Sequence, residues 1–126
     1  MGIDNPNVIL LVDDSFQNNE LMQVVLEKEG YETMMASNGM EALEAIRQRH
    51  PDLIILDIMM PGMDGYALLD HLKRTEPVPH IPVIMLTARN NQKDLQKAME
   101  MGAADYVIKP IDIEDILVRV NKVLKN

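Results

Sequence analysis

The chain of 126 residues contains no cysteine and no tryptophan, and only three tyrosines and one phenylalanine. The absence of cysteine excludes thiol catalysis, thiolate metal sites and disulfide bonds. Basic residues are also few, 12 against 20 acidic ones, whereas a surface that binds nucleic acid needs clustered Lys and Arg. No apolar run approaches the ~20 residues that cross a bilayer, and residues 1–6 do not form a signal peptide. We therefore expect one cytoplasmic domain over residues 1–126, without direct contact to nucleic acid or membrane.

Five short apolar segments predict β-strands. They are Val8–Val12, Thr33–Ala36, Leu53–Leu56, Val83–Leu86 and Tyr106–Ile108. All but the second are nearly continuous rather than alternating, which is typical of strands covered on both faces in a parallel sheet. The second is weaker and flanked by polar residues, so we expect it at an edge of the sheet.

The segments between and after these strands show the apolar spacing of helices. The first helix is expected to begin after Ser15 and to stop at Gly30, and the last is expected to begin after Asp112 as its N-cap. The other helices are predicted at Gly39–Arg49, Tyr66–Lys73 and Gln92–Met101. This alternation predicts an α/β fold of the (βα)5 type, a flavodoxin-like, doubly wound parallel sheet of five strands with helices on both faces.

Polar side chains follow four of the five predicted strands. Asp13 and Asp14 follow the first strand, Asp57 the third, Thr87 the fourth and Lys109 the fifth. Ligands of open α/β sheets bind beyond the carboxyl ends of the strands, so we expect these side chains to converge there. Three carboxylates that meet repel one another, which calls for either a protonated carboxyl group or a bound cation. Oxygen ligands without cysteine favour Mg²⁺ or Mn²⁺ over zinc.

This set of side chains also fits phosphoryl chemistry. A carboxylate beside a divalent cation can attack phosphorus and form an acyl phosphate, while an ammonium and a hydroxyl stabilise the transferring oxygens. Asp57, Lys109 and Thr87 suit these three tasks. Residues 58–65, which follow Asp57, contain a proline and two glycines that fix turns and let the backbone approach the site.

The sequence resembles the receiver domain of two-component response regulators, most like the single-domain, chemotaxis-regulator-like type. The motifs that carry the resemblance are VDDS at 12–15, LDIMMPGMDG at 56–65, LTA at 86–88 and GAADYVIKP at 102–110. They occur in order at the four strand ends that carry polar residues, and the resemblance covers essentially the whole chain.

The resemblance implies a phosphoacceptor site. Asp57 would accept a phosphoryl group from the phosphohistidine of a histidine kinase or phosphotransfer protein. Asp14 and Asp57 would bind Mg²⁺ directly and Asp13 would bind it through water. The backbone carbonyl of Met59 would complete the protein ligands.

The resemblance also implies a switch. Thr87 and Lys109 would each contact a phosphoryl oxygen, and the peptide bond between Lys109 and Pro110 is expected to be cis. Tyr106 would turn inward when Thr87 moves toward the phosphate, and a downstream protein would detect the change on the face of the fourth helix, fifth strand and fifth helix. The sequence departs from the family at Ile111, where an aromatic residue often follows Lys-Pro.

Other functions fit parts of the pattern. A Mg²⁺-dependent aspartyl-phosphate phosphohydrolase needs a second acid two residues after the nucleophile, where Met59 stands. A nucleotide- or flavin-binding module needs a glycine- or hydroxyl-rich first loop, but residues 13–16 are DDSF. A degenerate receiver that only binds partners is disfavoured because every phosphorylation position is present. We therefore expect a phosphoacceptor that dephosphorylates itself, not a turnover enzyme.

The remaining expectations concern the extent and oligomeric state of the chain, and the role of Asp105. The start at Met1 favours a complete single-domain protein that acts as a monomer or weak dimer, and the alternative is a receiver segment of a longer regulator or hybrid kinase. Asp105 is interpreted as a turn or cap residue.

Overall fold

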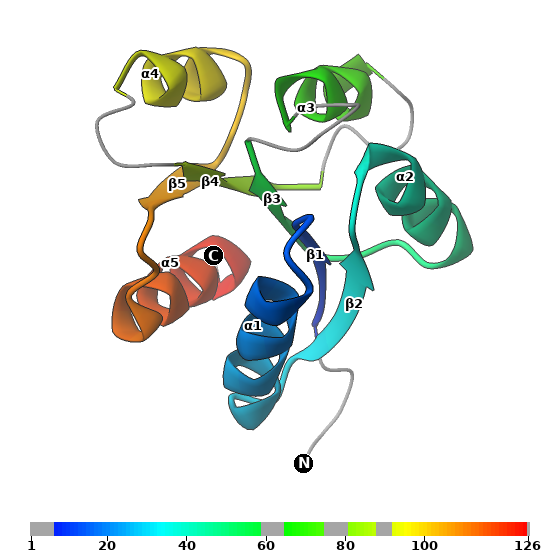
Figure 1. Cartoon of the computed structure of the whole chain (residues 1–126), viewed down its shortest axis with the longest axis vertical. Helices are drawn as coiled ribbons and strands as arrows, with labels where there is room; N and C mark the ends of the chain where they lie inside the picture. The colour runs from blue at the N-terminus through cyan, green and yellow to red at the C-terminus, as the bar shows by residue number, and fades with distance from the viewer. Residues whose placement is uncertain (1–6, 59–64, 75–80, 88–91, 126) are drawn as a thin grey trace.

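Strands and helices alternate along the part of the chain that the structure describes (Figure 1). The computed structural model describes residues 7–58, 65–74, 81–87 and 92–125. Its elements are β1 (Val8–Val12), α1 (Phe16–Lys28), β2 (Glu32–Ala36), α2 (Gly39–Gln48), β3 (Leu53–Asp57), α3 (Gly65–Arg74), β4 (Val83–Thr87), α4 (Gln92–Glu100), β5 (Asp105–Ile108) and α5 (Ile113–Lys125). Each predicted strand and helix is present, so the (βα)5 prediction is confirmed.

The five strands form one parallel sheet in the order β2-β1-β3-β4-β5. The chain leaves β1 for β2 on one side and then returns to the other side of β1 to form β3. Val12 therefore lies between Ala36 on β2 and Leu56 on β3 in the register. Open sheets leave a crevice for ligands where the strand order reverses in this way. The ends of β1 and β3 thus lie side by side at the expected binding position.

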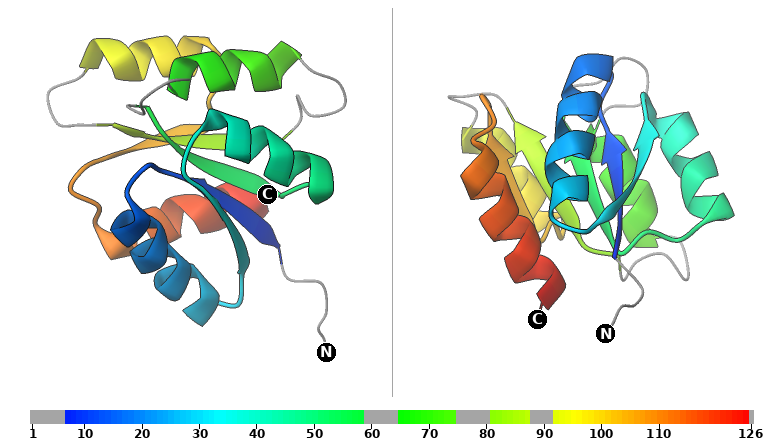
Figure 2. Two further views of the ribbon diagram at one scale, coloured as in Figure 1. Left: turned by 45° about the vertical axis from the view of Figure 1, so that its right-hand side comes forward. Right: turned by 90° about the horizontal axis from the view of Figure 1, so that it is seen from below.

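Helices cover both faces of the sheet (Figure 2). Side chains of a strand alternate between its two faces, so the residues of β1 divide between two cores. Leu10 and Val12 belong to the core beneath α2, α3 and α4, whereas Ile9 and Leu11 belong to the core beneath α1 and α5. Every residue of β1, β3 and β4 is buried, as their continuous apolar runs predict.

The sheet has two edge strands, of which the sequence pattern identified one. β2 lies at an edge as predicted, and β5 lies at the other. The expectation that the run 106–108 is covered on both faces is wrong for Ile108, which is 42% exposed. An edge strand has a neighbour on one side only, so its last residue extends beyond the packed helices.

Local capping fixes the helix ends. The Ser15 hydroxyl accepts a hydrogen bond from the Asn18 backbone N–H at the start of α1. The Asp112 carboxylate accepts hydrogen bonds from backbone N–H groups in the first turn of α5. Gly30, with φ of +97°, follows α1 where a left-handed residue ends a helix. These three predictions are confirmed.

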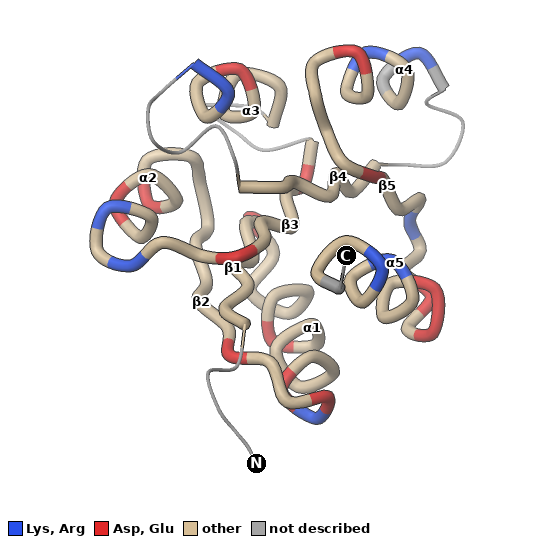
Figure 3. Tube along the Cα trace, turned by 180° about the vertical axis from the view of Figure 1, so that it is seen from behind, with Lys and Arg blue, Asp and Glu red and all other residues tan. Residues whose placement is uncertain are grey.

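All five helices carry charged residues of both signs (Figure 3). Some pair along one helix, such as Arg47 with Glu44 on α2 and Arg74 with Asp70 on α3. Exposed pairs of this kind contribute only a few tenths of a kcal/mol, roughly, to stability. In the described part of the chain, no helix is long and apolar enough to span a membrane.

Candidate functional site

Three carboxylates meet where β1 and β3 end. Asp13 and Asp57 are buried, with 3% and 4% of their surface exposed, and Asp14 beside them is exposed. Each offers a carboxylate oxygen within 4.8 Å of the oxygens of the others. The register explains this convergence, because Asp13 and Asp57 each follow directly on the paired residues Val12 and Leu56. The group can hold a metal ion, since a cation relieves the mutual repulsion of the carboxylates.

Lys109 extends from the end of β5 to the buried carboxylate of Asp57. Its Nζ lies 3.1 Å from Asp57 Oδ2, and the Lys109 side chain is 30% exposed. The Lys109 backbone N–H donates to the Thr87 carbonyl at 2.7 Å, and the Lys109–Pro110 peptide bond is cis as the resemblance implies. One ammonium against three carboxylates leaves a formal charge of −2, which a divalent cation would balance.

Thr87 ends β4 with its hydroxyl inside the protein. The residue is 1% exposed, and its Oγ1 has no hydrogen-bond partner within the described part of the chain. A buried polar group left in this state costs roughly 1–3 kcal/mol. The register pairs Asp57 with Leu86, so Thr87 lies one residue beyond Asp57 on the neighbouring strand. The hydroxyl is therefore available to an oxygen of a ligand bound at Asp57.

Two asparagines that the sequence analysis did not select fix the position of Asp13 at the end of β1. Asn18 Nδ2 donates to Asp13 Oδ2 at 3.2 Å. The buried Asn19 donates from Nδ2 to the carbonyls of Asp13, at 3.1 Å, and Ala36, at 3.2 Å, and so ties the end of β1 to the end of β2. The sequence did contain a signal that could have identified Asn19, because this residue lies on the same buried face of α1 as Met22 and Leu26. A polar residue in such a stripe needs buried partners.

Gly65, the first residue of α3, lies close against the backbone at the end of β3. The Gly65 backbone N–H donates to the Ile58 carbonyl at 2.8 Å. A Cβ atom on Gly65 would lie 2.6 Å from Ile58 Cα and 2.7 Å from the Asp57 carbonyl oxygen. The prediction that a glycine lets the backbone approach here is confirmed for Gly65. Met59, the predicted carbonyl ligand, lies outside the described residues.

Tyr106 lies on β5, which β4 separates from β3 and its terminal residue Asp57. It is partly exposed, packs against the core beneath α2, α3 and α4, and pairs with Met85 two residues before Thr87. Asp105 is not the turn or cap residue that the sequence indicated. It begins β5, and its carboxylate accepts a hydrogen bond from the Tyr106 backbone N–H and forms an ion pair with Arg119 of α5. The ion pair joins positions too far apart in the sequence for local spacing to indicate it.

Comparison with known proteins extends the resemblance to nearly the whole chain. A family profile described as response regulator receiver domain matches residues 9–121. The phosphate regulon transcriptional regulatory protein PhoB of Pseudomonas aeruginosa is 42% identical over 117 residues, which are 93% of this chain and 51% of that protein. The sporulation initiation phosphotransferase F of Bacillus subtilis is 40% identical over 116 residues, which are 92% of each chain. The chain thus spans about half the length of the first relative and most of the second.

A solved structure agrees with this assignment. The crystal structure of the receiver domain of NtrX from Brucella abortus matches with a TM-score of 0.88 at 35% identity. The match covers 94% of this chain and 98% of that one. The likeness therefore includes the fold and about a third of the sequence.

Proposed function

This chain belongs to the response regulator receiver domain family, and from that premise we propose that Asp57 accepts a phosphoryl group from the phosphohistidine of a histidine kinase or phosphotransfer protein. The observation that carries the proposal is the Lys109 ammonium at 3.1 Å from the buried Asp57 carboxylate, with the buried Thr87 hydroxyl at the end of the neighbouring strand unpaired among the described residues. A nucleophile, a cation and a hydrogen-bond donor are the groups that phosphoryl transfer needs.

The transfer forms one bond and breaks another. A carboxylate oxygen of Asp57 attacks phosphorus, and the bond between phosphorus and the donor nitrogen breaks, with the imidazole leaving with the electron pair. Lys109 pairs with one phosphoryl oxygen as negative charge shifts onto it. The Thr87 hydroxyl donates a hydrogen bond to another phosphoryl oxygen. The product is an acyl phosphate on Asp57.

We propose that the three carboxylates hold Mg²⁺. The oxygen donors of Asp13, Asp14 and Asp57 and the residual negative charge fit a hard divalent cation, with Mn²⁺ as a second choice. When bound, Mg²⁺ supplies positive charge that offsets the charge of the transferring oxygens. The hydrogen bonds from Asn18 and the Ser15 backbone N–H hold the Asp13 carboxylate in place for this task.

We further propose that Tyr106 is the switch residue and that the face of α4, β5 and α5 carries the signal to a downstream protein. Thr87 and Tyr106 lie on adjacent strands two register positions apart, so a movement of Thr87 toward phosphate alters the space beside the tyrosine ring. Turnover of free phosphate esters is not part of the proposal, because Met59 stands where such enzymes carry a proton donor.

Intact mass spectrometry after incubation with acetyl phosphate and Mg²⁺ tests the acceptor. The wild-type protein is expected to gain one phosphoryl group, and Asp57→Asn is expected to gain none, because an amide is a poor nucleophile. Asp70→Asn is the matched control, since Asp70 is an exposed aspartate on α3 that pairs along its own helix with Arg74. Phosphoryl uptake by Asp57→Asn at the wild-type rate would overturn the assignment.

A further inference from the structure

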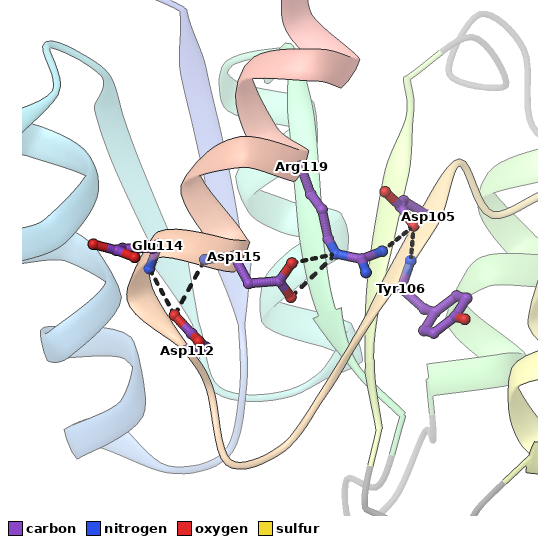
Figure 4. A network of polar contacts seen from close by, with 6 residues as sticks. All are labelled: Asp105, Tyr106, Asp112, Glu114, Asp115 and Arg119. Atoms are coloured by element: carbon purple, nitrogen blue, oxygen red, sulfur yellow. Dashed lines mark hydrogen bonds and ion pairs between the residues drawn. The ribbon is translucent and has the colours of Figure 1, made fainter.

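Arg119 of α5 lies between two carboxylates that belong to different elements (Figure 4). Its Nε donates to both oxygens of Asp115, at 3.1 and 3.2 Å, and its Nη1 donates to Asp105 Oδ1 at 2.6 Å. Asp115 lies one turn earlier on α5, whereas Asp105 begins β5. The rigid fork of the guanidinium thus links the helix to the strand, which a lysine ammonium could not do in the same geometry.

The same guanidinium also contacts Tyr106. Arg119 Cζ lies 5.4 Å from the centroid of the Tyr106 ring, within the range of a cation–π interaction. Asp105 Oδ1, which accepts from Arg119, accepts a second hydrogen bond from the Tyr106 backbone N–H at 2.8 Å. The backbone and the ring of Tyr106 are therefore both attached to one ion pair.

The contact joins the two faces of the sheet. Tyr106 packs against the core beneath α2, α3 and α4, whereas α5 packs with α1 on the opposite face. Because β5 is an edge strand, no further strand separates α5 from the outer side of Tyr106. Arg119 can thus reach the ring around the edge of the sheet.

The surroundings of Arg119 favour the charged form of its guanidinium. Partial burial lowers the pKa of its guanidinium, but the hydrogen bond to Asp115 and the negative charges of Asp105 and Asp115 outweigh this effect, and the net pKa is raised. The Arg119 guanidinium that faces the Tyr106 ring is therefore positively charged at neutral pH.

We propose that Arg119 is a positioning residue that holds Tyr106 at the edge of β5 in the unphosphorylated protein and couples its movement to α5. The positioning role in the unphosphorylated protein is supported by the contacts of Arg119 with Asp105, Asp115 and Tyr106 and does not depend on phosphorylation. The coupling to phosphorylation rests on the proposed function of Asp57 and Tyr106.

Fluorine NMR of protein labelled with 3-fluorotyrosine tests the first part. The chain has three tyrosines, Tyr31, Tyr66 and Tyr106, and Tyr106→Phe assigns the signal of interest. Arg119→Ala is expected to shift and broaden the Tyr106 signal, because the ring loses the cation that restrains it. Asp115→Asn is expected to shift the same signal in the same direction by less, since Asp105 still holds the guanidinium.

The other two tyrosines separate a local effect from a general loss of packing. The Tyr31 hydroxyl bonds Asn121, two residues after Arg119 on α5, so displacement of α5 itself would move the Tyr31 signal. The Tyr66 ring lies beneath Lys97 and reports on the contact between α3 and α4. Arg74→Ala is the matched control variant, because Arg74 forms the same i, i+4 pair with an aspartate, Asp70, and both of these side chains are exposed.

Two outcomes overturn the positioning role. In one, the Tyr106 signal in Arg119→Ala differs from wild type by no more than it does in Arg74→Ala. In the other, the Tyr31 signal moves as far as the Tyr106 signal, which would show that Arg119 only packs α5.

Backbone amide shifts of α5 before and after treatment with acetyl phosphate and Mg²⁺ test the coupling. Arg119→Ala is expected to take up phosphate like the wild type but to show smaller phosphorylation-dependent shifts in α5. Equal shifts in two equally phosphorylated proteins would overturn the coupling. Absence of phosphate from both proteins would instead count against the proposed function of Asp57, while the fluorine result would still decide the positioning role.

Discussion

Asp57 lies at the end of β3 with its carboxylate buried against the ammonium of Lys109. Burial disfavours an ionised carboxylate, and the neighbouring cation offsets that cost. Thr87 contributes a buried hydroxyl donor that has no hydrogen-bond partner among the residues that the structure describes. The reactivity of Asp57 therefore depends on side chains from β4 and from the residue after β5, 30 and 52 positions further along the chain.

Glu41 provides a prediction at the scale of one residue. Its Oε1 accepts hydrogen bonds from the backbone N–H and the hydroxyl of Ser37, both at 2.8 Å, and these lower the pKa of Glu41 from 4.5. Because the pKa of Glu41 is lower in the folded protein than in the unfolded one, the ionised carboxylate stabilises the folded state at pH values above the ordinary pKa. The contribution is lost as the pH falls through the lowered pKa.

Urea unfolding of wild type and Glu41→Gln at about pH 7 and about pH 3 measures this contribution. The wild-type protein is expected to be the more stable at the higher pH, and the difference is expected to shrink at the lower pH. A difference that is the same at both values would contradict the role of the ionised carboxylate.

The connection from β3 to α3 provides a prediction at the scale of an element. A Cβ atom at position 65 would meet backbone atoms of Asp57 and Ile58, which cannot yield as a flexible side chain can. Gly65→Ala is therefore expected to cost about 1–3 kcal/mol of folding free energy. It is also expected to slow phosphoryl uptake from acetyl phosphate, because relief of the clash displaces Asp57. Urea unfolding and mass spectrometry measure the two effects.

Gly30→Ala is the matched control for this prediction. Gly30 has a positive φ of +97°, and nothing lies within 4 Å of the position of its Cβ. Alanine there is expected to cost about 1–2 kcal/mol through backbone strain alone, without an effect on phosphoryl uptake. If both variants lost stability but kept the wild-type uptake rate, the close approach of Gly65 to the end of β3 would not position the acceptor.

The acidic cluster provides a prediction at the scale of the whole molecule. Asp13, Asp14 and Asp57 come together only in the folded chain, so Mg²⁺ is expected to bind the folded state in preference to the unfolded one. Ligand linkage then predicts a gain of about 2.7 kcal/mol when Mg²⁺ is present at 100 times its dissociation constant. Thermal or urea unfolding in MgCl₂ and in EDTA measures the gain.

Two controls separate specific binding from screening of charge. NaCl at the same ionic strength is expected to stabilise the protein less than MgCl₂ does. Asp14→Asn is expected to stabilise the metal-free protein, because one repelling charge is removed, and to reduce the gain from Mg²⁺. A gain from Mg²⁺ that is equal in wild type and Asp14→Asn would contradict a site at this cluster.

Much of this architecture could be predicted from the sequence because the pattern of apolar residues in each strand or helix shows which of its faces are buried. Continuous apolar runs indicated β1, β3 and β4, and the polar residues that follow them indicated Asp13, Asp57 and Thr87 as neighbours at one end of the sheet. Caps at Ser15 and Asp112 were predictable because each acts within one helical turn.

The tertiary structure decided what depends on packing between elements distant in the sequence. The strand order placed β5 at an edge and exposed Ile108, which its apolar run did not indicate. Asn19 reaches a carbonyl on β2, and Arg119 reaches a carboxylate on β5, through contacts that no local spacing specifies. The physical reason is that the type and spacing of residues in one element indicate which side chains are buried. The partner of each side chain is determined only when the strands and helices pack together.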